Sequence, residues 1–258
     1  MPSPSPSPLT EAILSRATHD SISLTALPFL PSALSSISSL SLPTPTPNLT
    51  FTHATKTDTH THAIPPWFRA LAPLAAGRAT PDWDPAAHLA FMAARGIAHS
   101  VLSISTPAAN AFSHLGDAAE RKERTIALAR LLNEYGARVC ALWPGRFSWM
   151  AVVPLPYVEA AVVEARYALG ELGAVGVGVL TNHEGWYVGD VRFDALWGEV
   201  ERWAGEQEDG RGVVFVHPTE PVVRLGDGRI VMSRPCKFAL LPMLYYGIRE
   251  LGGMVDVV

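Results

Sequence analysis

From residue 56 onward, short runs rich in β-branched and apolar residues alternate with longer stretches whose apolar residues recur every three or four positions. The first pattern predicts strands and the second predicts amphipathic helices. The predicted strands are Lys56–Thr61, Ser100–Ser105, Ser148–Val153, Val175–Leu180 and Val213–His217. The predicted helices are Pro85–Arg95, Ala118–Tyr135, Val158–Leu172 and Phe193–Ala204, with Gly96, Gly136 and Gly173 as expected C-terminal caps. This alternation indicates an α/β fold with parallel strands and right-handed crossovers, either an open sheet or an eight-stranded barrel.

The first part of the chain has a different composition. Residues 1–50 contain 12 Ser, 9 Pro and 6 Thr, and their only acidic or basic residues besides histidine are Glu11, Arg16 and Asp20. Such a biased segment is typical of disorder. We therefore divide the chain into a disordered, low-complexity tail (residues 1–55), an α/β portion (residues 56–221) and a divergent C-terminal segment (residues 222–258).

Composition excludes several functional classes. The chain is 48% hydrophobic and 17% charged with a formal net charge of −4, which argues against a nucleic-acid binder. Its apolar stretches are shorter than the ~20 residues of a membrane span, so no membrane partner is expected. Cys140 and Cys236 form no CxxC motif, so we expect reduced thiols and a cytoplasmic location. Dinucleotide-binding, Walker A and GxSxG motifs do not occur in the sequence.

Histidines close the first predicted strand. Because side chains alternate along a strand, His60 and His62 are expected to project to one side, together with Asp58. Two neutral imidazoles on one face can share a divalent metal such as Zn²⁺. Pro65 and Pro66 follow directly, which places the pair at the carboxyl end of the strand, where parallel α/β folds carry their active sites.

The fifth predicted strand repeats this arrangement. Four apolar residues lead to His217, and Pro218 follows. His217 is therefore the third candidate metal ligand, although a single histidine is also commonly a hydrogen-bonded structural residue. His183 lies in the loop after the fourth strand, where it could reach a substrate or simply belong to an ordinary loop.

Three segments, taken in order, resemble the metal-dependent decarboxylase branch of the amidohydrolase-related superfamily, which includes the 6-methylsalicylate and aminocarboxymuconate-semialdehyde decarboxylases. They are Asp58-Thr-His-Thr-His62 with Ala-Ile-Pro-Pro, the loop Gly178-Val-Leu-Thr-Asn182 with Gly185 and Tyr187, and Val214-Phe-Val-His-Pro218. The resemblance extends from about Lys56 to Pro221.

The resemblance implies a (β/α)₈ barrel that holds one divalent metal, zinc or alternatively manganese, on His60, His62 and His217. It also implies a further histidine after the sixth strand and an aspartate at the eighth. The metal would hold the carboxylate and neighbouring hydroxyl of a small aromatic carboxylic acid such as a salicylate, whose ring carbon is protonated as carbon dioxide leaves. The expected substrate contacts are Trp67, Arg69, Asn182 and His183, although a solvated loop would also account for the first two.

The chain departs from this pattern after His217. Only 41 residues remain, whereas three further β/α units would need about 90, so we expect a C-terminally truncated, partial TIM-type barrel with about five of eight units. The remainder has no histidine, and nothing in the sequence assigns Asp256 to the eighth-strand position. Two explanations account for the loss of the family pattern after His217. The chain is a shortened paralogue, or its last residues come from an altered reading frame or a retained intron.

Three functional readings stay open at this point: a decarboxylase, a catalytically dead barrel fragment, and a metal-dependent hydrolase of the amidohydrolase type. Because an open sheet would leave Val213–His217 as an edge or half-covered strand, we also expect a poorly soluble chain or a homo-oligomer.

Overall fold

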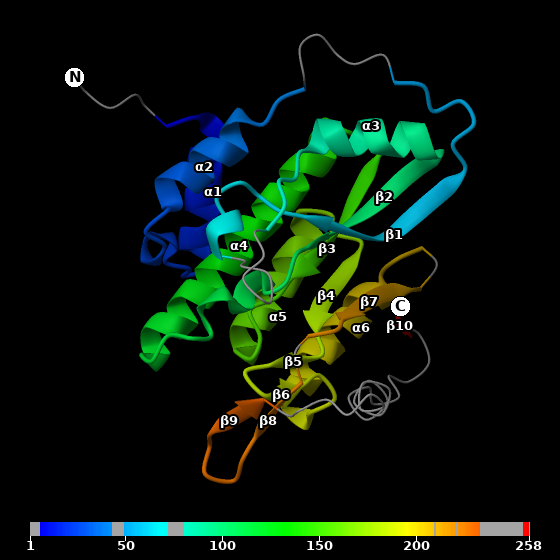
Figure 1. Cartoon of the computed structure of the whole chain (residues 1–258). Coiled ribbons are helices and arrows are strands. Elements are labelled where there is room, and N and C mark those ends of the chain that lie inside the picture. Colours follow the sequence, from blue (N-terminus) through cyan, green and yellow to red (C-terminus); the bar gives the residue numbers. More distant parts are fainter. Residues whose placement is uncertain are drawn as a thin grey trace, which may run out of the picture.

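A curved parallel sheet forms the centre of the computed structural model, which describes residues 6–42, 49–71, 80–208, 210–219, 221–232 and 255–257 (Figure 1). The order of the strands is β1-β2-β3-β4-β7-β10. Their bounds are β1 (Lys56–Ala63), β2 (Ile97–Ile104), β3 (Phe147–Val152), β4 (Gly176–Leu180), β7 (Gly212–His217) and β10 (Val255–Val257). Two antiparallel hairpins join β5 (Asn182–His183) to β6 (Trp186–Tyr187) and β8 (Val222–Arg224) to β9 (Ile230–Met232).

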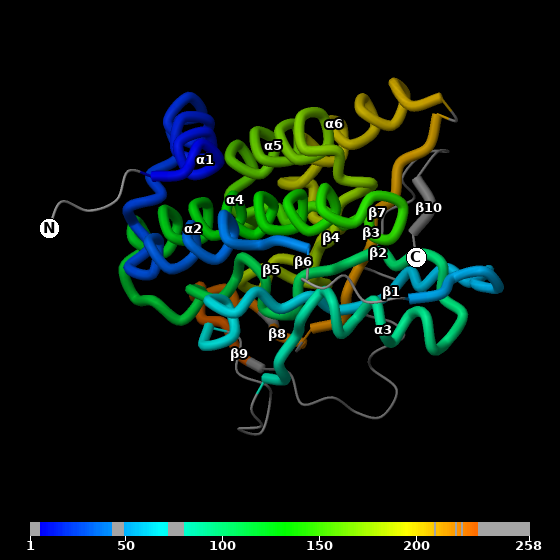
Figure 2. The backbone as a smooth tube through the Cα atoms, turned by 90° about the horizontal axis from the view of Figure 1, so that it is seen from above, coloured from blue at the N-terminus to red at the C-terminus, as the bar shows by residue number. Residues whose placement is uncertain are grey.

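Helices connect the parallel strands, and α4, α5 and α6 form a layer along one side of the sheet (Figure 2). The α-helices are α1 (Pro8–His19), α2 (Leu30–Ser39), α3 (Pro85–Arg95), α4 (Ala118–Leu142), α5 (Val158–Arg166) and α6 (Asp194–Gly205). Short helical turns cover Leu24–Ala26, Arg69–Leu71, Ala108–Phe112, Tyr167–Glu171 and Val191–Phe193. No helix in the described parts of the chain combines the length and apolar character needed to cross a bilayer.

The five expected strands form in parallel and in the expected order, which confirms a partial TIM-type sheet. Among the described residues the sheet stays open, with β1 at one edge and β10 at the other. β10 pairs only with Gly212–Val214, so β7 is half-covered. This pairing puts Asp256 beside Val213, whereas His217 lies four residues further along β7.

The helix ends follow local chemistry, with one exception. Asp84 caps α3 by accepting the Ala87 N–H at 2.8 Å, and Gly96 ends the helix in the left-handed conformation, as expected. The expectation that Gly136 caps α4 is wrong, because that helix continues to Leu142. A Cβ at Gly136 would lie 2.6 Å from the Trp149 ring, so this glycine permits close packing of α4 against β3.

The expected disordered tail is also wrong for the described part of residues 1–55, which forms α1 and α2. Their apolar side chains, including Ile13, Ala17, Leu34 and Ile37, are buried in the main hydrophobic core. Apolar residues at helical spacing therefore outweigh the Ser and Pro content of this segment.

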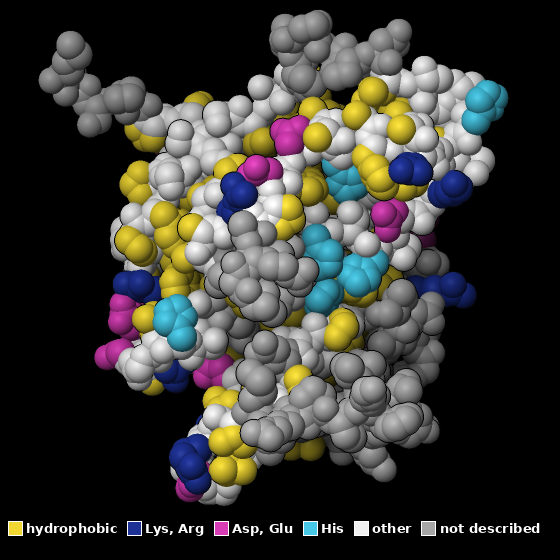
Figure 3. Space-filling view, viewed as in Figure 1, with side chains coloured by type: hydrophobic (Ala, Val, Ile, Leu, Met, Phe, Trp, Pro, Cys, Tyr) yellow, Lys and Arg dark blue, Asp and Glu magenta, His cyan; other side chains and the backbone are white. Residues whose placement is uncertain are grey.

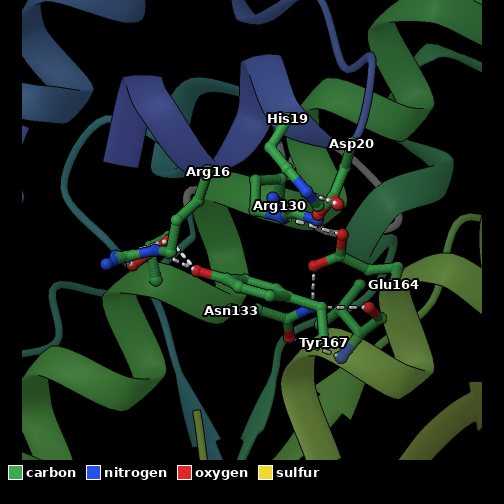
Figure 4. Close-up of polar contacts among 9 residues, drawn as sticks. Arg16, His19, Asp20, Arg130, Asn133, Glu164 and Tyr167 are labelled. Carbon is green, nitrogen blue, oxygen red and sulfur yellow. Dashed lines mark hydrogen bonds and ion pairs between the residues drawn. The ribbon is translucent and has the colours of Figure 1, made fainter. Parts of the chain in front are cut away.

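A buried polar network joins α1 to the helices behind the sheet (Figure 4). Arg130 on α4 donates hydrogen bonds to Glu164 on α5 at 2.9 Å and to Asp20 at the end of α1 at 2.6 Å. Arg16 on α1 binds both carboxylate oxygens of Glu134 on α4, at 2.9 and 3.0 Å. The first helix, α1, is thus attached to α4 by charge pairs as well as by apolar packing.

The two faces of the sheet carry different side chains. Leu102, Trp149 and Val177 belong to the main core. The opposite, inner face carries a smaller apolar cluster of Val101, Met150 and Phe215. The candidate site lies on this inner face.

Candidate active site

Three histidines meet where β1 and β7 end, although these strands occupy the first and fifth positions of the sheet. One ligand nitrogen from each of His60, His62 and His217 lies within 4.8 Å of the others. The Nε2 atoms of His60 and His62 are 3.2 Å apart. Histidine side chains gather on this face of the molecule (Figure 3). The curvature of the sheet therefore brings the three predicted ligands together.

Outer contacts orient two of these imidazoles. The Nδ1 atom of His62 lies 3.2 Å from the Ser105 hydroxyl. His217 Nδ1 lies 2.7 Å from the Pro218 carbonyl, which can only accept a hydrogen bond, so this nitrogen carries the proton. The Nε2 atom of His217 is then the one with a lone pair for a ligand, which is the usual arrangement of metal-binding histidines.

Burial favours the neutral form of two of these imidazoles, His62 and His217. It is the main cause that lowers the pKa of His62 to about 4, and the charges of His217 and His60 act in the same direction. Burial also lowers the pKa of His217, and His60 contributes. Neutral imidazole is the form that binds a metal ion, so His62 and His217 are available to a cation near neutral pH.

The expectation that Asp58 shares the face of the histidines is wrong. A register irregularity lies between Asp58 and Thr61, so both residues pair with positions on the same side of β2. The Asp58 carboxylate accepts the His60 N–H at 3.1 Å and acts electrostatically on His88 of α3. A β-bulge thus separates the carboxylate from the imidazoles.

A cavity opens beside His217. It has an empty volume of about 430 Å³, which includes space open to solvent. Its described lining residues come from β2, from β3 and the residue after it, from β4, β5 and β7, and from the helical turn Ala108–Phe112. They are Ser103, Ile104, Ala108, Ala109, Asn110, Met150, Val152, Val153, Gly178, Val179, Leu180, His183, Phe215 and His217. The walls are mainly apolar with a few polar groups.

Of the four expected substrate contacts, only His183 is among the described residues that line this cavity. Its Nδ1 lies 2.9 Å from Asn110 Oδ1, and its Nε2 accepts the Leu180 N–H at 3.2 Å. Burial lowers the pKa of His183 to about 3. With both nitrogens engaged, this neutral ring shapes the pocket.

Trp67 and Arg69 lie outside the residues that line this cavity and contact other parts of the protein. The Trp67 ring stacks on Phe29 with centroids 5.7 Å apart. The Arg69 guanidinium binds the Thr80 carbonyl at 2.7 Å and the Asp82 carboxylate at 2.5 Å. These side chains hold the loop after β1 in place.

Asn182 stabilises the turn between β5 and β6, since its Oδ1 accepts the Gly185 N–H at 3.4 Å.

Sequence reasoning missed Ser103 and Asn110 in the pocket. Ser103 could have been noticed as a polar residue in an apolar strand, whereas nothing in the sequence singles out Asn110.

An open parallel β/α sheet with three imidazoles at the carboxyl ends of its strands is typical of metal-binding proteins of the TIM-barrel type. Comparison with known families identifies the family to which the chain belongs. The Amidohydro_2 family, described as amidohydrolase, matches residues 57–229, and the chain belongs to this family.

The curated relatives that match include decarboxylases. Decarboxylase yanB of Aspergillus niger is 32% identical over 143 residues, which cover 54% of this chain and 35% of that protein. The gamma-resorcylate decarboxylase of Rhizobium radiobacter is 29% identical over 153 residues, covering 57% and 42%. The 6-methylsalicylic acid decarboxylase of Penicillium expansum is 36% identical over 103 residues, covering 38% and 29%. The chain thus spans well under half the length of these relatives.

Solved structures that are similar to this chain include an amidohydrolase and decarboxylases. An amidohydrolase II structure has a TM-score of 0.55 and 32% identity, and the match covers 65% of this chain and 51% of that one. The 2,6-dihydroxybenzoate decarboxylase from Rhizobium has a TM-score of 0.51 and 26% identity, covering 67% and 51%. A dihydroxybenzoic acid decarboxylase from Polaromonas with bound manganese, at 21% identity and a TM-score of 0.50, shares the fold.

Proposed function

We propose that this chain carries the metal-binding half of a non-oxidative decarboxylase that acts on a small aromatic carboxylic acid of the salicylate type. The observation that carries the proposal is the convergence of three imidazole nitrogens at strand ends, in a family whose curated relatives here are decarboxylases. The divalent ion would be held by His60, His62 and His217, with Zn²⁺ and Mn²⁺ as the two candidates.

The donor set fits such an ion. Imidazole is a good ligand for borderline divalent metals, and three protein ligands leave further positions for a substrate. A bound cation would hold the carboxylate and neutralise charge that develops during the reaction. The overall change replaces the carboxylate on a ring carbon with a proton and releases carbon dioxide.

The chain's own residues would then position the acid. Met150, Val152 and Phe215 offer apolar walls for a flat ring next to His217. The outer contacts of His62 with Ser105 and of His217 with Pro218 keep the imidazoles oriented toward the shared centre.

The first test is elemental analysis of the purified chain after loading with Zn²⁺ or Mn²⁺ and removal of excess ion. We expect about one equivalent in the parent chain, none in a His60→Ala/His62→Ala variant, and an unchanged content in the control His114→Ala, which alters an exposed histidine. No bound metal in the parent chain would contradict the proposal and favour an inactive scaffold.

The second test measures chemistry. Carbon dioxide release from salicylate-type acids by the loaded chain would support decarboxylation. Hydrolysis of ester or amide substrates without carbon dioxide release would instead indicate that the chain is a metal-dependent hydrolase.

A further inference from the structure

The ring of His60 contacts residues of a distant strand. His60 belongs to β1 at the edge of the sheet, and three strands lie between β1 and β7. Its imidazole nevertheless packs against Phe215 and His217 of β7, with ring centroids 4.8 and 5.4 Å apart. The direction in which β1 sends this side chain therefore decides whether the three ligand nitrogens can meet.

The backbone of β1 is irregular at this residue. Asp58 is in register with Ser100, and Thr61 is in register with Leu102, so β1 contains one residue more than β2 over this stretch. His60 lies within the irregularity. An extra residue of this kind bends a strand and changes the direction of the side chains next to it. The orientation of His60 thus depends on a local backbone conformation that regular strand pairing does not supply.

The Asp58 side chain stabilises this conformation. Its Oδ1 accepts the His60 N–H at 3.1 Å, a contact between residues two apart that is typical of Asx turns. A bulge disrupts the hydrogen-bond ladder locally, and backbone N–H groups require an acceptor. The carboxylate supplies this acceptor and links the position of the His60 backbone to its own.

Asp58 itself faces away from the histidines. Residues that pair in register point to the same face of a sheet, and its partner Ser100 has the opposite strand parity to Ser103, which lines the cavity. The Asp58 charge acts on His88 of α3, which lies outside the histidine cluster. Among the described residues, the group of potential metal ligands consists of the three histidines alone. Asp58 can therefore affect the metal centre only through the backbone of His60 or through its charge.

We propose that Asp58 is a positioning residue of the metal centre, which orients His60 through the hydrogen bond to its backbone N–H and does not coordinate the ion. The proposal rests on the metal-binding part of the proposed function and deepens it. Ser105 and the Pro218 carbonyl contact the rings of His62 and His217, and Asp58 provides the corresponding support for His60 through the main chain.

The test uses two substitutions that separate geometry from charge. Asp58→Asn retains an oxygen acceptor at the same distance from the backbone and removes the charge, whereas Asp58→Glu retains the charge and moves the acceptor by one methylene. Competition with a chromogenic chelator measures the Zn²⁺ affinity of each full chain. We expect Asp58→Asn to stay within about twofold of the parent and Asp58→Glu to bind about tenfold more weakly, as is typical when support behind a ligand is lost.

A matched control and a second readout exclude a general effect on folding. Asp227 accepts the Arg229 N–H at 3.0 Å in the turn between β8 and β9, which is the same kind of contact, so Asp227→Glu should leave Zn²⁺ affinity unchanged. The visible absorption spectrum of the Co²⁺-loaded chain reports ligand geometry. It should be the same for the parent and Asp58→Asn and should differ for Asp58→Glu. If Asp58→Glu does not fold, Asp58→Ala, which removes the acceptor, takes its place.

The outcomes separate this proposal from the proposed function. If Asp58→Asn binds Zn²⁺ as weakly as Asp58→Glu, Asp58 acts through its charge or as a ligand. If Asp58→Glu matches the parent in affinity and in Co²⁺ spectrum, the hydrogen bond does not orient His60. Either result would overturn the positioning role and leave the metal centre intact. No Zn²⁺ bound by the parent chain would overturn the proposed function, and the positioning role with it.

Discussion

Arg130 and Glu164 form an ion pair that is closed off from solvent: the guanidinium is 0% exposed, the carboxylate is 1% exposed, and the Nε–Oε2 distance is 2.9 Å. Asn133 donates to the second carboxylate oxygen of Glu164 at 2.7 Å. The pair links α4 to α5, and Arg130 also contacts Asp20 on the N-terminal side. A buried pair with most of its hydrogen bonds made is sensitive to loss of one member, because the other charge is then stranded.

Arg130→Met should therefore lower the free energy of unfolding by about 3 kcal/mol or more. Arg124→Met, which breaks a partly exposed pair with Glu120 on the same helix, should cost less than about 1 kcal/mol. Urea denaturation measures both. The double variant Arg130→Met/Glu164→Leu should cost less than the sum of the two single changes, since neither the Arg130 guanidinium nor the Glu164 carboxylate is then left buried without the other. Equal losses for Arg130→Met and Arg124→Met would contradict this account.

The N-terminal helices are expected to contribute directly to stability. Ile37 on α2 is fully buried, whereas Leu42 just beyond the helix is 46% exposed. Ile37→Ala should cost about 2–5 kcal/mol through lost burial and a cavity, and Leu42→Ala should have little effect. Thermal unfolding compares them. If Ile37→Ala unfolds like the parent chain, the segment is not part of the cooperative core.

Strands β3, β4 and β7 were predictable because apolar and β-branched residues stay contiguous in a buried parallel sheet, and His217 was identified for the same reason. The N-terminal helices were not recognised, because frequent Ser and Pro obscured the helical spacing of Ile13 with Ala17 and of Ala33 with Ile37. These helices are stabilised by packing against the rest of the protein, and amino-acid composition alone does not indicate such packing.

The candidate site shows a similar division. His60 and His62 could be placed on one face by simple alternation, but Asp58 could not, because a bulge breaks the alternation and leaves little trace in the sequence. Ser103 and Asn110 escaped notice because serine and asparagine are common at strand ends and in loops. Only the register with His62 and the hydrogen bond to His183 reveal their place.

Two helical glycines should respond to alanine in opposite ways. At Gly136 an added Cβ would lie 2.6 Å from the Trp149 ring, so Gly136→Ala should cost about 1–3 kcal/mol by overpacking. Gly198 on α6 has no atom within 4 Å of the added Cβ, so Gly198→Ala should stabilise by about 0.5–1 kcal/mol. Chemical denaturation measures the free energy of unfolding of both variants. Stabilisation by Gly136→Ala would show that α4 and β3 do not pack this closely.

The stability of the chain should fall on acidification, in part because of His183. Its pKa is about 3 in the folded chain against about 6.5 when unfolded, so between these values the unfolded state binds the extra proton. Stability is retained above pH 6.5 and lost as the pH falls toward 3, by about 2 kcal/mol at pH 5 from this residue. Urea denaturation at pH 7.5 and pH 5 should show a smaller difference for His183→Gln than for the parent chain. An identical difference in both would rule out a buried neutral His183.

Metal affinity should depend on the hydroxyl behind His62. If Nε2 of His62 binds the ion, its Nδ1–H donates to Ser105 Oγ, now 3.2 Å away, and this contact fixes the ring. Loss of such an outer contact typically weakens metal binding by about 10–100-fold, so Ser105→Ala should bind Zn²⁺ about tenfold more weakly. Competition with a chromogenic chelator measures the affinity, with the exposed Ser113→Ala as control. Added Zn²⁺ should also stabilise the parent chain by about 2.7 kcal/mol at one hundred times its dissociation constant. Unchanged affinity in Ser105→Ala together with full stabilisation by the ion would mean that His62 binds through Nδ1 or is oriented by other groups.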